Sequence, residues 1–226
     1  MKSVVLLSGG LDSAVSLACA MGESVVELCL TFDYGQLAAD KEILAAAALA
    51  GHYQLSHKVV KLPFLREITD NALVCSDVSL PEPDPADLDK PEAAAAIAAN
   101  VWIPNRNGLF INIAAAFAEA YGAGLIAAGF NREEAAAFPD NSEGFVRAVN
   151  NCLEYSVREQ MKAISYTQRL DKVDIVKLGK RLSVPFQYIW SCYRGGETMC
   201  GKCESCRRLI RAAQLAGLSL SEFRFA

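Results

Sequence analysis

Chemistry-bearing residues gather in two short stretches, one near each end of the chain. Near the start, residues 8–13 read SGGLDS and combine two glycines with hydroxyl and carboxylate side chains. Glycines have no side chain to block an anion that approaches the backbone N–H groups. Neither the dinucleotide-binding glycine pattern nor the Walker A lysine is present here. The stretch therefore favours a phosphate-binding turn of another kind, with a purely structural turn as the alternative.

Near the other end, four cysteines follow the spacing C-x7-C-x2-C-x2-C. The two-residue gaps let neighbouring thiolates converge on one ion, and Gly201 eases the turn between the second and third cysteine. Four cysteines that leave no open position describe a structural, tetrahedral zinc site. An iron–sulfur cluster is the alternative, and a chance grouping of free thiols is the third. The four residues are Cys192, Cys200, Cys203 and Cys206.

The elements around the glycines must hold them at one edge of a sheet. Residues 4–7 form an apolar run that predicts a buried strand of a parallel sheet. Residues 14–21 favour a helix, which would begin near Asp12 and Ser13. A strand, a glycine turn and a helix N-terminus together aim backbone N–H groups and the positive end of a helix dipole at one spot.

Four more strands are expected at residues 25–32, 57–62, 125–128 and 163–167, with helical stretches between them. This alternation predicts an α/β fold with a parallel five-stranded sheet. Polar turns follow two of these strands, at Asp33-Tyr34 and after Gly129. Ligands bind at the carboxyl ends of such strands, so these residues are candidates for ligand contacts.

Residues 66–101 interrupt the alternation. They hold several prolines and five acidic residues between Asp77 and Asp89. We expect an exposed, mobile insertion that is either a lid or an inert loop, followed by a short helix near residues 92–100. The division expected for the chain is residues 1–185 as the main domain and 186–226 as a metal-binding region.

Arginines stand at two further places. Arg106 precedes a helix expected at residues 109–121 and capped by Asn107, where it could hold a phosphate or a carboxylate or be merely solvated. Asp171 is expected to cap a helix over residues 172–182. The final helix carries Arg207, Arg208 and Arg211, which would meet an anionic ligand or form a solvated basic face.

The composition limits the classes of function. Apolar residues make up 52% of the 226 residues, which is enough for a substantial core. The net charge of −4 argues against an extended nucleic-acid surface, and no apolar run reaches membrane-spanning length. The absence of an export signal favours a cytoplasmic protein, in which grouped cysteines bind metal. The scattered cysteines, Cys19, Cys29, Cys75 and Cys152, are expected to be buried free thiols.

Several stretches together carry a resemblance to a known family. The SGGLDS string resembles the pyrophosphate loop (PP-loop) of the N-type ATP pyrophosphatases, which cleave ATP to AMP and pyrophosphate while they adenylate a substrate. Taken in order over nearly the whole chain, the motifs are similar to those of the 7-cyano-7-deazaguanine synthase family. The motifs are SGGLDS, FDYGQ, PNRN, GFNREE with FPDNS, LDKVDIVKLG, SCY and CGKCESC.

The resemblance implies a fold of the adenine-nucleotide α-hydrolase-like (Rossmann-like) type with a C-terminal zinc-binding appendage. It also implies that 7-carboxy-7-deazaguanine, ammonia and ATP with magnesium give the nitrile in queuosine or archaeosine precursor synthesis. Asp12, Ser13 and Lys172 would be catalytic. Asp12 would bind magnesium or brace the loop, because its charge repels phosphate. Nucleotide contacts are expected from Ser8, Gly9, Gly10, Leu11, Asp12, Ser13, Asp33, Tyr34, Arg106 and Gly129.

Partners are expected to be these small molecules, without nucleic acid or membrane, and a homodimer stays open. Two other functions compete with this hypothesis. A tRNA-thiolating PP-loop enzyme would use cysteines catalytically or on an iron–sulfur cluster, and would carry a basic surface for tRNA. A non-enzymatic nucleotide sensor would bind ATP and release no pyrophosphate with any substrate. Neither accounts for the FPDN stretch as well as the synthase family does.

Overall fold

A computed structural model describes residues 1–225, and its five strands form one parallel sheet in the order β3-β2-β1-β4-β5. The central strand is β1 (Lys2–Leu6), which pairs with β2 (Val25–Asp33) and β4 (Leu125–Ala128). The outer strands are β3 (His57–Lys61) and β5 (Lys162–Ser165). The predicted α/β fold with a parallel five-stranded sheet is confirmed.

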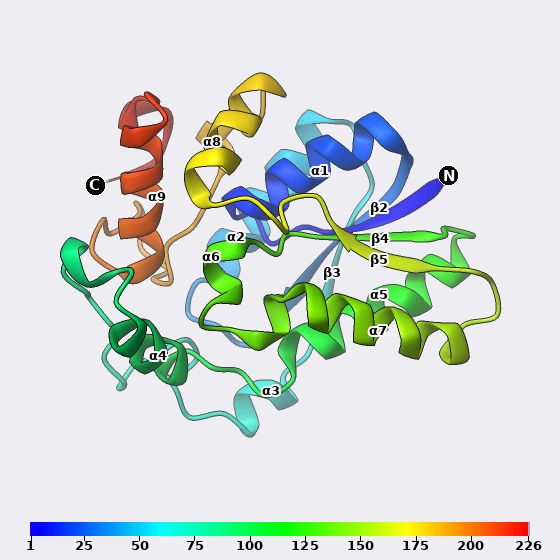
Figure 1. Cartoon of the computed structure of the whole chain (residues 1–226), viewed down its shortest axis with the longest axis horizontal. Coiled ribbons are helices and arrows are strands. Elements are labelled where there is room, and N and C mark those ends of the chain that lie inside the picture. Colours follow the sequence, from blue (N-terminus) through cyan, green and yellow to red (C-terminus); the bar gives the residue numbers. More distant parts are fainter. Residues whose placement is uncertain (226) are drawn as a thin grey trace.

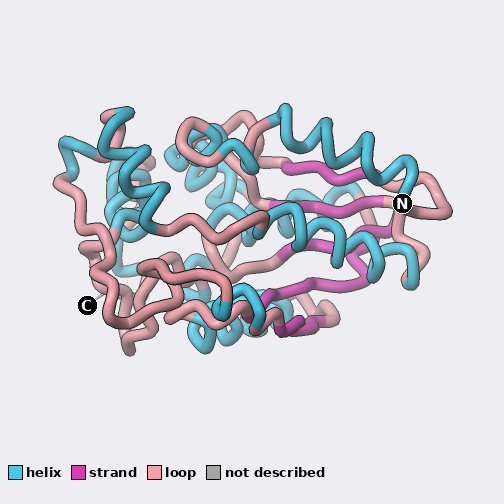
Figure 2. Tube along the Cα trace, turned by 90° about the horizontal axis from the view of Figure 1, so that it is seen from below, coloured by secondary structure: helices cyan, strands magenta, loops and turns pink. Residues whose placement is uncertain are grey.

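Helices cover both faces of this sheet (Figures 1 and 2). One face packs against α1 (Leu11–Glu23), α2 (Ala39–His52) and α8 (Lys172–Arg181), and the other against α5 (Arg106–Ala120) and α7 (Glu143–Ser156). Successive strand residues point to opposite faces, so Val5 packs into the first layer and Val4 into the second. Both faces of the inner strands β1, β2 and β4 are therefore buried, as their continuous apolar runs predict.

Shorter elements complete the fold. The remaining α-helices are α3 (Phe64–Glu67), α4 (Pro91–Asn100), α6 (Arg132–Ala135) and α9 (Glu204–Leu215), and the 3₁₀ turns are η1 (Pro85–Asp87), η2 (Pro139–Asn141), η3 (Phe186–Tyr188) and η4 (Leu220–Glu222). Helix α9 packs beside α8, and buried Leu209 of α9 joins the same core as Val5 of the central strand. One core thus joins the two parts predicted to divide at residue 185, and that division stays a prediction.

The order of the strands creates a crevice where the chain changes direction. After β1 the chain builds the sheet outward through β2 and β3, and it then returns to place β4 on the other side of β1. The connections that leave β1 and β4 therefore diverge at their carboxyl ends, the position at which open α/β sheets bind ligands. The SGGLDS loop and Gly129 both lie at this point.

The insertion at residues 66–101 is packed against the rest of the chain through buried apolar side chains. Leu73 and Val74 join the core on the α5 side of the sheet, and Leu88 is fully buried. The expectation that the whole segment is exposed is therefore wrong at these positions, whereas its mobility stays a prediction. The short helix expected near residues 92–100 is confirmed as α4.

Two local expectations are also wrong. Asn107 lies inside α5 rather than at its cap, because the helix begins at Arg106, three residues before the expected start, and Asn105, at φ 51°, takes the capping position. The buried Asn107 side chain instead donates to the carbonyl of Asp140 at 3.3 Å. Among the scattered cysteines, Cys29 is buried as expected, but Cys152 is exposed on α7.

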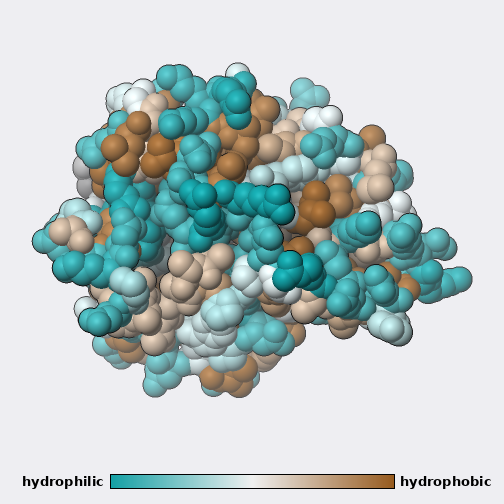
Figure 3. Space-filling view, viewed as in Figure 1, coloured by the Kyte–Doolittle hydropathy of each residue, from teal (hydrophilic) through white to brown (hydrophobic). Residues whose placement is uncertain are grey.

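The surface is mixed in character. Figure 3 shows hydrophilic side chains over much of one face, with hydrophobic ones in separate patches. Within the described residues, none of the helices combines the length and the apolar composition needed to span a bilayer.

Gly129 is the contact point between the end of β4 and the first turn of α1. A Cβ atom at this position would lie 2.7 Å from the backbone nitrogen of Ser13 and 2.9 Å from the carbonyl carbon of Asp12. We predict that Gly129→Ala lowers the free energy of unfolding by about 1–3 kcal/mol, because the added methyl group forces backbone apart. Urea denaturation at constant pH measures this change.

Gly22→Ala is the matched control, since Gly22 lies in the same helix α1 and a Cβ there meets no atom within 4 Å. Replacing a helical glycine in open space should stabilise the protein by about 0.5–1 kcal/mol. A Gly129→Ala variant as stable as the wild type would contradict the tight contact between β4 and α1.

Candidate active site and metal centre

A cavity opens at the carboxyl edge of the sheet, between the SGGLDS loop and the C-terminal region. Most of its lining comes from three parts of the chain: the loop with α6 and α8; a largely aromatic group from the end of β2, from α5 and from the start of η2; and residues around the cysteines. The insertion adds Leu73 and Val101. The first part supplies Ser8, Gly10, Leu11, Asp12, Ser13, Gly129, Glu134 and Lys172. The second includes Phe32, Tyr34, Arg106, Phe110 and Phe138, and the third includes Trp190, Ser191, Tyr193, Glu204 and Ser205.

The SGGLDS loop is held by the hydroxyl of Ser13. This oxygen accepts the backbone N–H of Ser8 at 3.2 Å, lies 3.0 Å from the Ser8 hydroxyl, and donates to the carbonyl of Gly10 at 3.0 Å. Gly10 is the N-cap of α1 and has no side chain to cover the first N–H groups of the helix. The loop thus presents the positive end of α1 to the cavity, a geometry that suits a phosphate.

Two residues predicted to contact the nucleotide are not among the cavity-lining residues. Gly9, at φ 82°, faces α2, where a Cβ atom would lie 2.8 Å from the Glu42 carbonyl oxygen. This close approach of two backbones, together with the positive φ, requires a glycine. The carboxylate of Asp33 accepts the backbone N–H of Gly35 at 3.1 Å and so braces its own turn. Direct contacts from Gly9 and Asp33 to a nucleotide stay a prediction.

Lys172 is one of the cations that line the cavity, and it is held by two carboxylates. Its Nζ atom donates to Asp12 Oδ2 and, at 2.7 Å, to Glu134 Oε1. The lysine is only 9% exposed. Burial lowers the pKa of Lys172, but the two carboxylates outweigh burial and raise that pKa above its ordinary value. The ammonium group therefore stays charged, and it is placed to meet an anion in the cavity.

Asp12 has one carboxylate oxygen to spare. Burial raises the pKa of Asp12 to about 6, although Lys172 opposes the shift. Its second oxygen, Oδ1, is buried without a hydrogen-bond partner among residues 1–225. Magnesium takes carboxylate oxygens as ligands, so an orphaned buried oxygen beside an expected triphosphate fits a magnesium ligand. Asp12 thus pairs with Lys172 through one oxygen and leaves the other unpaired, and both predicted roles of Asp12, magnesium binding and loop bracing, stay predictions.

The aromatic part of the lining is a group of rings in mutual contact. Phe32 stacks on Phe110 with ring centroids 4.1 Å apart and planes at 8°, and Tyr34 lies 5.9 Å from Phe110. Arg106 donates to the Tyr34 hydroxyl at 3.4 Å and lies over its ring. Arg106 is thus held at the cavity, as the sequence predicts. A planar ring with anionic or carbonyl groups would find both a stacking surface and a cation here.

Sequence reasoning missed several lining residues. Glu42 is a half-buried residue whose carboxylate accepts from Gln36 Nε2 at 2.8 Å, and desolvation raises its pKa to about 6. Glu134, Trp190 and Tyr193 line the same cavity. Glu134 lies inside the GFNREE motif and could have been picked out as an acidic group near a strand end. Nothing in the spacing of Glu42, Trp190 or Tyr193 indicates that they reach the cavity.

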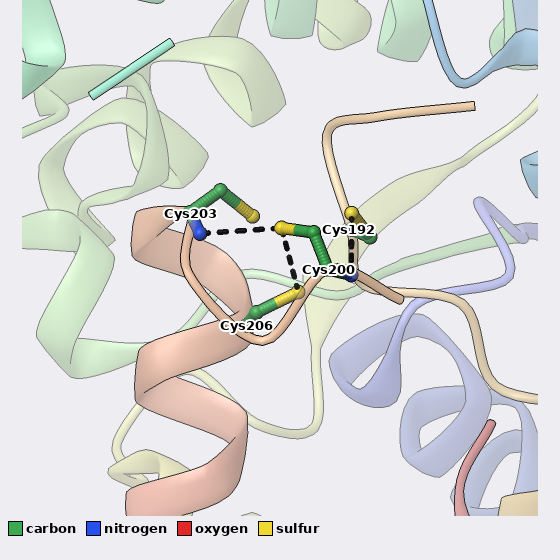
Figure 4. Close-up of side chains that lie close together, drawn as sticks. All are labelled: Cys192, Cys200, Cys203 and Cys206. Atoms are coloured by element: carbon green, nitrogen blue, oxygen red, sulfur yellow. Dashed lines mark hydrogen bonds between the residues drawn. The ribbon is translucent and has the colours of Figure 1, made fainter. Parts of the chain in front are cut away.

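The four clustered cysteines converge as predicted. Their Sγ atoms all lie within 4.8 Å of one another, and Figure 4 shows the side chains pointing toward a common centre. Cys192, Cys203 and Cys206 are buried, and Cys200 is half-buried. The cluster therefore brings four sulfur ligands to one point, which is the arrangement of a closed metal site.

The backbone around the cysteines favours thiolates. The Sγ atom of Cys200 accepts N–H groups from Lys202 and Cys203 at 3.4 and 3.3 Å, and that of Cys192 accepts N–H groups from Arg194 and Cys200 at 3.3 and 3.4 Å. Cys203 is the N-cap of α9, where the helix dipole favours negative charge. This donor set fits a metal that takes four thiolates, such as zinc.

Two arginines of α9 are paired with carboxylates of the chain. Arg208 is buried and bonded to Glu204, Glu133 and the carbonyl of Leu88, and Arg211 is paired with Asp89 and Glu133. A solvated face is therefore wrong for Arg208, whereas a contact of these arginines with an anionic ligand stays a prediction.

We predict that the purified chain carries a single zinc ion and that Cys206→Ser lowers both the zinc content and the melting temperature. The metal closes the turn that precedes α9, so its binding energy is also folding energy. Elemental analysis and a thermal melt measure the two effects. Cys152→Ser is the control, because it removes an exposed thiol far from the cluster in sequence. Iron with sulfide, or a stable fold without any metal, would contradict the prediction.

The chain is similar to known proteins over nearly its full length. Residues 2–217 match the family described as "Queuosine biosynthesis protein QueC". The 7-cyano-7-deazaguanine synthase of Pelotomaculum thermopropionicum is 61% identical over 220 residues, which cover 97% of this chain and all of that protein (100%). The enzyme of the same name from Desulforudis audaxviator is 59% identical over 217 residues, with 96% of this chain and 98% of that protein covered. With its PP-loop, its aromatic cavity and its cysteine cluster, the chain therefore belongs to the QueC family of queuosine biosynthesis proteins.

Proposed function

We propose that this chain converts 7-carboxy-7-deazaguanine and ammonia to 7-cyano-7-deazaguanine at the expense of ATP, as a carbon–nitrogen ligase of queuosine precursor synthesis. Membership of the family and the names of the relatives support the substrate class. One observation carries the proposal: residues of the SGGLDS loop and Lys172 line a single cavity together with a group of aromatic side chains. A nucleotide phosphate and a planar base can therefore meet in it.

The chain's own residues would act on the phosphates and the leaving group. A carboxylate is a poor electrophile for ammonia, and transfer of AMP to it creates a good leaving group. The N–H groups at the start of α1 and the Ser13 hydroxyl would hold the departing pyrophosphate, and Lys172 would neutralise its charge. Asp12 would hold magnesium through its free oxygen, and that ion would supply charge neutralisation on the triphosphate when bound. Tyr34 and Arg106 would contact the nucleotide or the deazaguanine ring. Gly129 would allow the close approach of α1 to the end of β4.

Formation of a nitrile requires that both oxygens of the carboxylate leave, so one activation is not sufficient. The first adenylation joins AMP to a carboxylate oxygen and releases pyrophosphate, and ammonia then displaces AMP to give the amide and a proton. The amide oxygen is adenylated by a second ATP. Loss of AMP, with removal of the nitrogen-bound protons, then leaves the carbon–nitrogen triple bond. One site can serve both halves, because the two substrates differ only in O versus NH2 at the reacting carbon.

Free ammonia is the proposed nitrogen donor. A glutaminase needs an activated nucleophile, usually a cysteine next to a histidine or at the N-terminus. The two histidines are His52, the last residue of α2, and His57 on β3, whose ring nitrogen lies 2.8 Å from the Thr31 hydroxyl. No hydrogen bond joins either histidine to a cysteine within residues 1–225.

Removing the cavity's cation should abolish turnover. We predict that Lys172→Ala lowers the rate of substrate-dependent pyrophosphate release by about 10²–10³-fold, because charge on the leaving group loses a fixed partner. Ser13→Ala should also lower this rate, since the Ser13 hydroxyl holds the loop. A coupled pyrophosphate assay measures both, and circular dichroism checks the fold.

Lys177→Ala is the matched control, because Lys177 lies on the same helix α8 with an exposed side chain that only faces Asp174 at 3.8 Å. It should keep wild-type turnover. Near-normal pyrophosphate release by a folded Lys172→Ala variant would remove Lys172 from the proposed site.

The synthetic amide tests the two-step mechanism. Supplied without ammonium, the amide should be converted to the nitrile with one AMP per product, against two when the reaction starts from the acid. The reason is that the amide enters after the first activation. Mass spectrometry of the product and AMP quantification give both numbers. An inert amide, or a single ATP consumed from the acid, would refute one site with two activations.

A further inference from the structure

We propose that Arg208 is a positioning residue of the reaction, which fixes Lys172 through Glu133 and holds the insertion at residues 66–101 against α9. The proposal rests on the function proposed above, since it concerns the placement of that site's cation. Arg208 lies on α9, outside the cavity lining, and it is 8% exposed. It acts through other residues and would touch no substrate.

The guanidinium group of Arg208 joins three segments that are far apart in sequence. On its own helix it pairs with Glu204 through Nε. From the insertion it binds the carbonyl of Leu88 at 2.7 Å through Nη2, and the carboxylate of Asp89 at 3.4 Å through Nη1. From α6 it binds Glu133 Oε2 at 3.1 Å through Nη1. Figure 1 shows the loop before α4 approaching α9, as these contacts require.

Glu133 connects Arg208 to Lys172. While Oε2 of Glu133 binds Arg208, and Arg211 at 3.3 Å, its other oxygen accepts the backbone N–H of Lys172 at 2.8 Å. That N–H belongs to the first residue of α8 and has no partner within the helix. The next residue along α6, Glu134, binds the Nζ atom of Lys172. Both ends of Lys172 are therefore held from α6, and α6 is held from α9.

Arg208 also contacts residues and segments that line the cavity. Its partner Glu204 accepts the Tyr193 hydroxyl at 3.0 Å, and both Glu204 and Tyr193 line the cavity. The insertion that Arg208 holds contributes Leu73 and Val101 to the same lining. A loss of the Arg208 contacts would thus loosen two walls and the cation together.

An arginine is required here for geometric reasons. Its planar fork presents five N–H donors in fixed directions, so one side chain can bind three carboxylates and a carbonyl at once. A lysine keeps the charge but is a point donor and cannot reproduce this set of directions. Arg208→Lys therefore removes the arrangement while it keeps a cation near the buried Glu204 and Glu133.

Two variants and one control test the proposal. Glu133→Gln is the second variant: Lys172 and Arg208 donate to different oxygens of Glu133, and an amide replaces one of these oxygens by an NH2 group, which cannot accept. Arg132→Met is the control: Arg132 lies beside Glu133 on α6 and its ion pair with Asp171, the cap of α8, is exposed. All proteins are measured as full chains for zinc content, melting temperature, pyrophosphate release and amide exchange by NMR.

We expect Arg208→Lys and Glu133→Gln each to lower kcat/KM for ATP by about 10–100-fold, as is typical when a residue that orients a site is lost. The kcat/KM of the double variant should be no lower than that of the less active single variant, because both substitutions remove the same contact between Arg208 and Glu133. Exchange of the Lys172 amide should accelerate in both single variants, and exchange over residues 84–90 in Arg208→Lys. Arg132→Met should stay within about threefold of the wild type, as expected for an exposed pair.

Three results would overturn the positioning role. The first is a wild-type kcat/KM in Arg208→Lys although its amide exchange is faster. The second is an unchanged exchange rate of the Lys172 amide in Arg208→Lys. The third is a double variant whose loss of kcat/KM equals the sum of the two single losses on a free-energy scale. The exchange measurement needs no substrate and no turnover. It therefore tests the link from Arg208 to Lys172 even if the wild-type chain forms no nitrile, a result that would overturn the proposed function alone.

Discussion

The buried ion group of Lys172, Asp12 and Glu134 is the constraint on which the rest of the site depends. Its members come from α8, α1 and α6, which are brought together only by the sheet order. A buried lysine is costly unless carboxylates surround it, and two buried carboxylates would repel one another without the lysine. Each member therefore requires the others, and the first turns of three helices are held at the carboxyl edge of the sheet.

The cysteine cluster lies far from the PP-loop in sequence, but the segment that carries it contributes to the site. The segment from Trp190 to Ser205 carries three of the four cysteines and also supplies one wall of the cavity. Trp190 hydrogen-bonds the carbonyl of Gly9 through its backbone N–H at 2.9 Å, so this segment is fastened directly to the PP-loop. A metal that holds the cysteines together would thus also hold that wall in place.

Patterns within single stretches were sufficient for much of the fold. The sequence pattern predicts all five strands, and Asp171 is the N-cap of α8 as expected. The cysteine spacing predicts the cluster, because ligands two residues apart must converge locally. The PP-loop also follows from its own residues, since the strand, the glycines and the helix start are adjacent in the chain.

The sequence by itself therefore determined the sheet, the PP-loop, the cysteine cluster and the family resemblance. Only the tertiary structure decided that Lys172 lies between Asp12 and Glu134, that Arg208 is buried among acids rather than solvated, and that Glu42 and Tyr193 reach the cavity. The physical reason is that local periodicity records which face of an element is buried. It does not record which distant charge meets that face, and the partners of a buried ion are fixed by the packing of elements far apart in the chain.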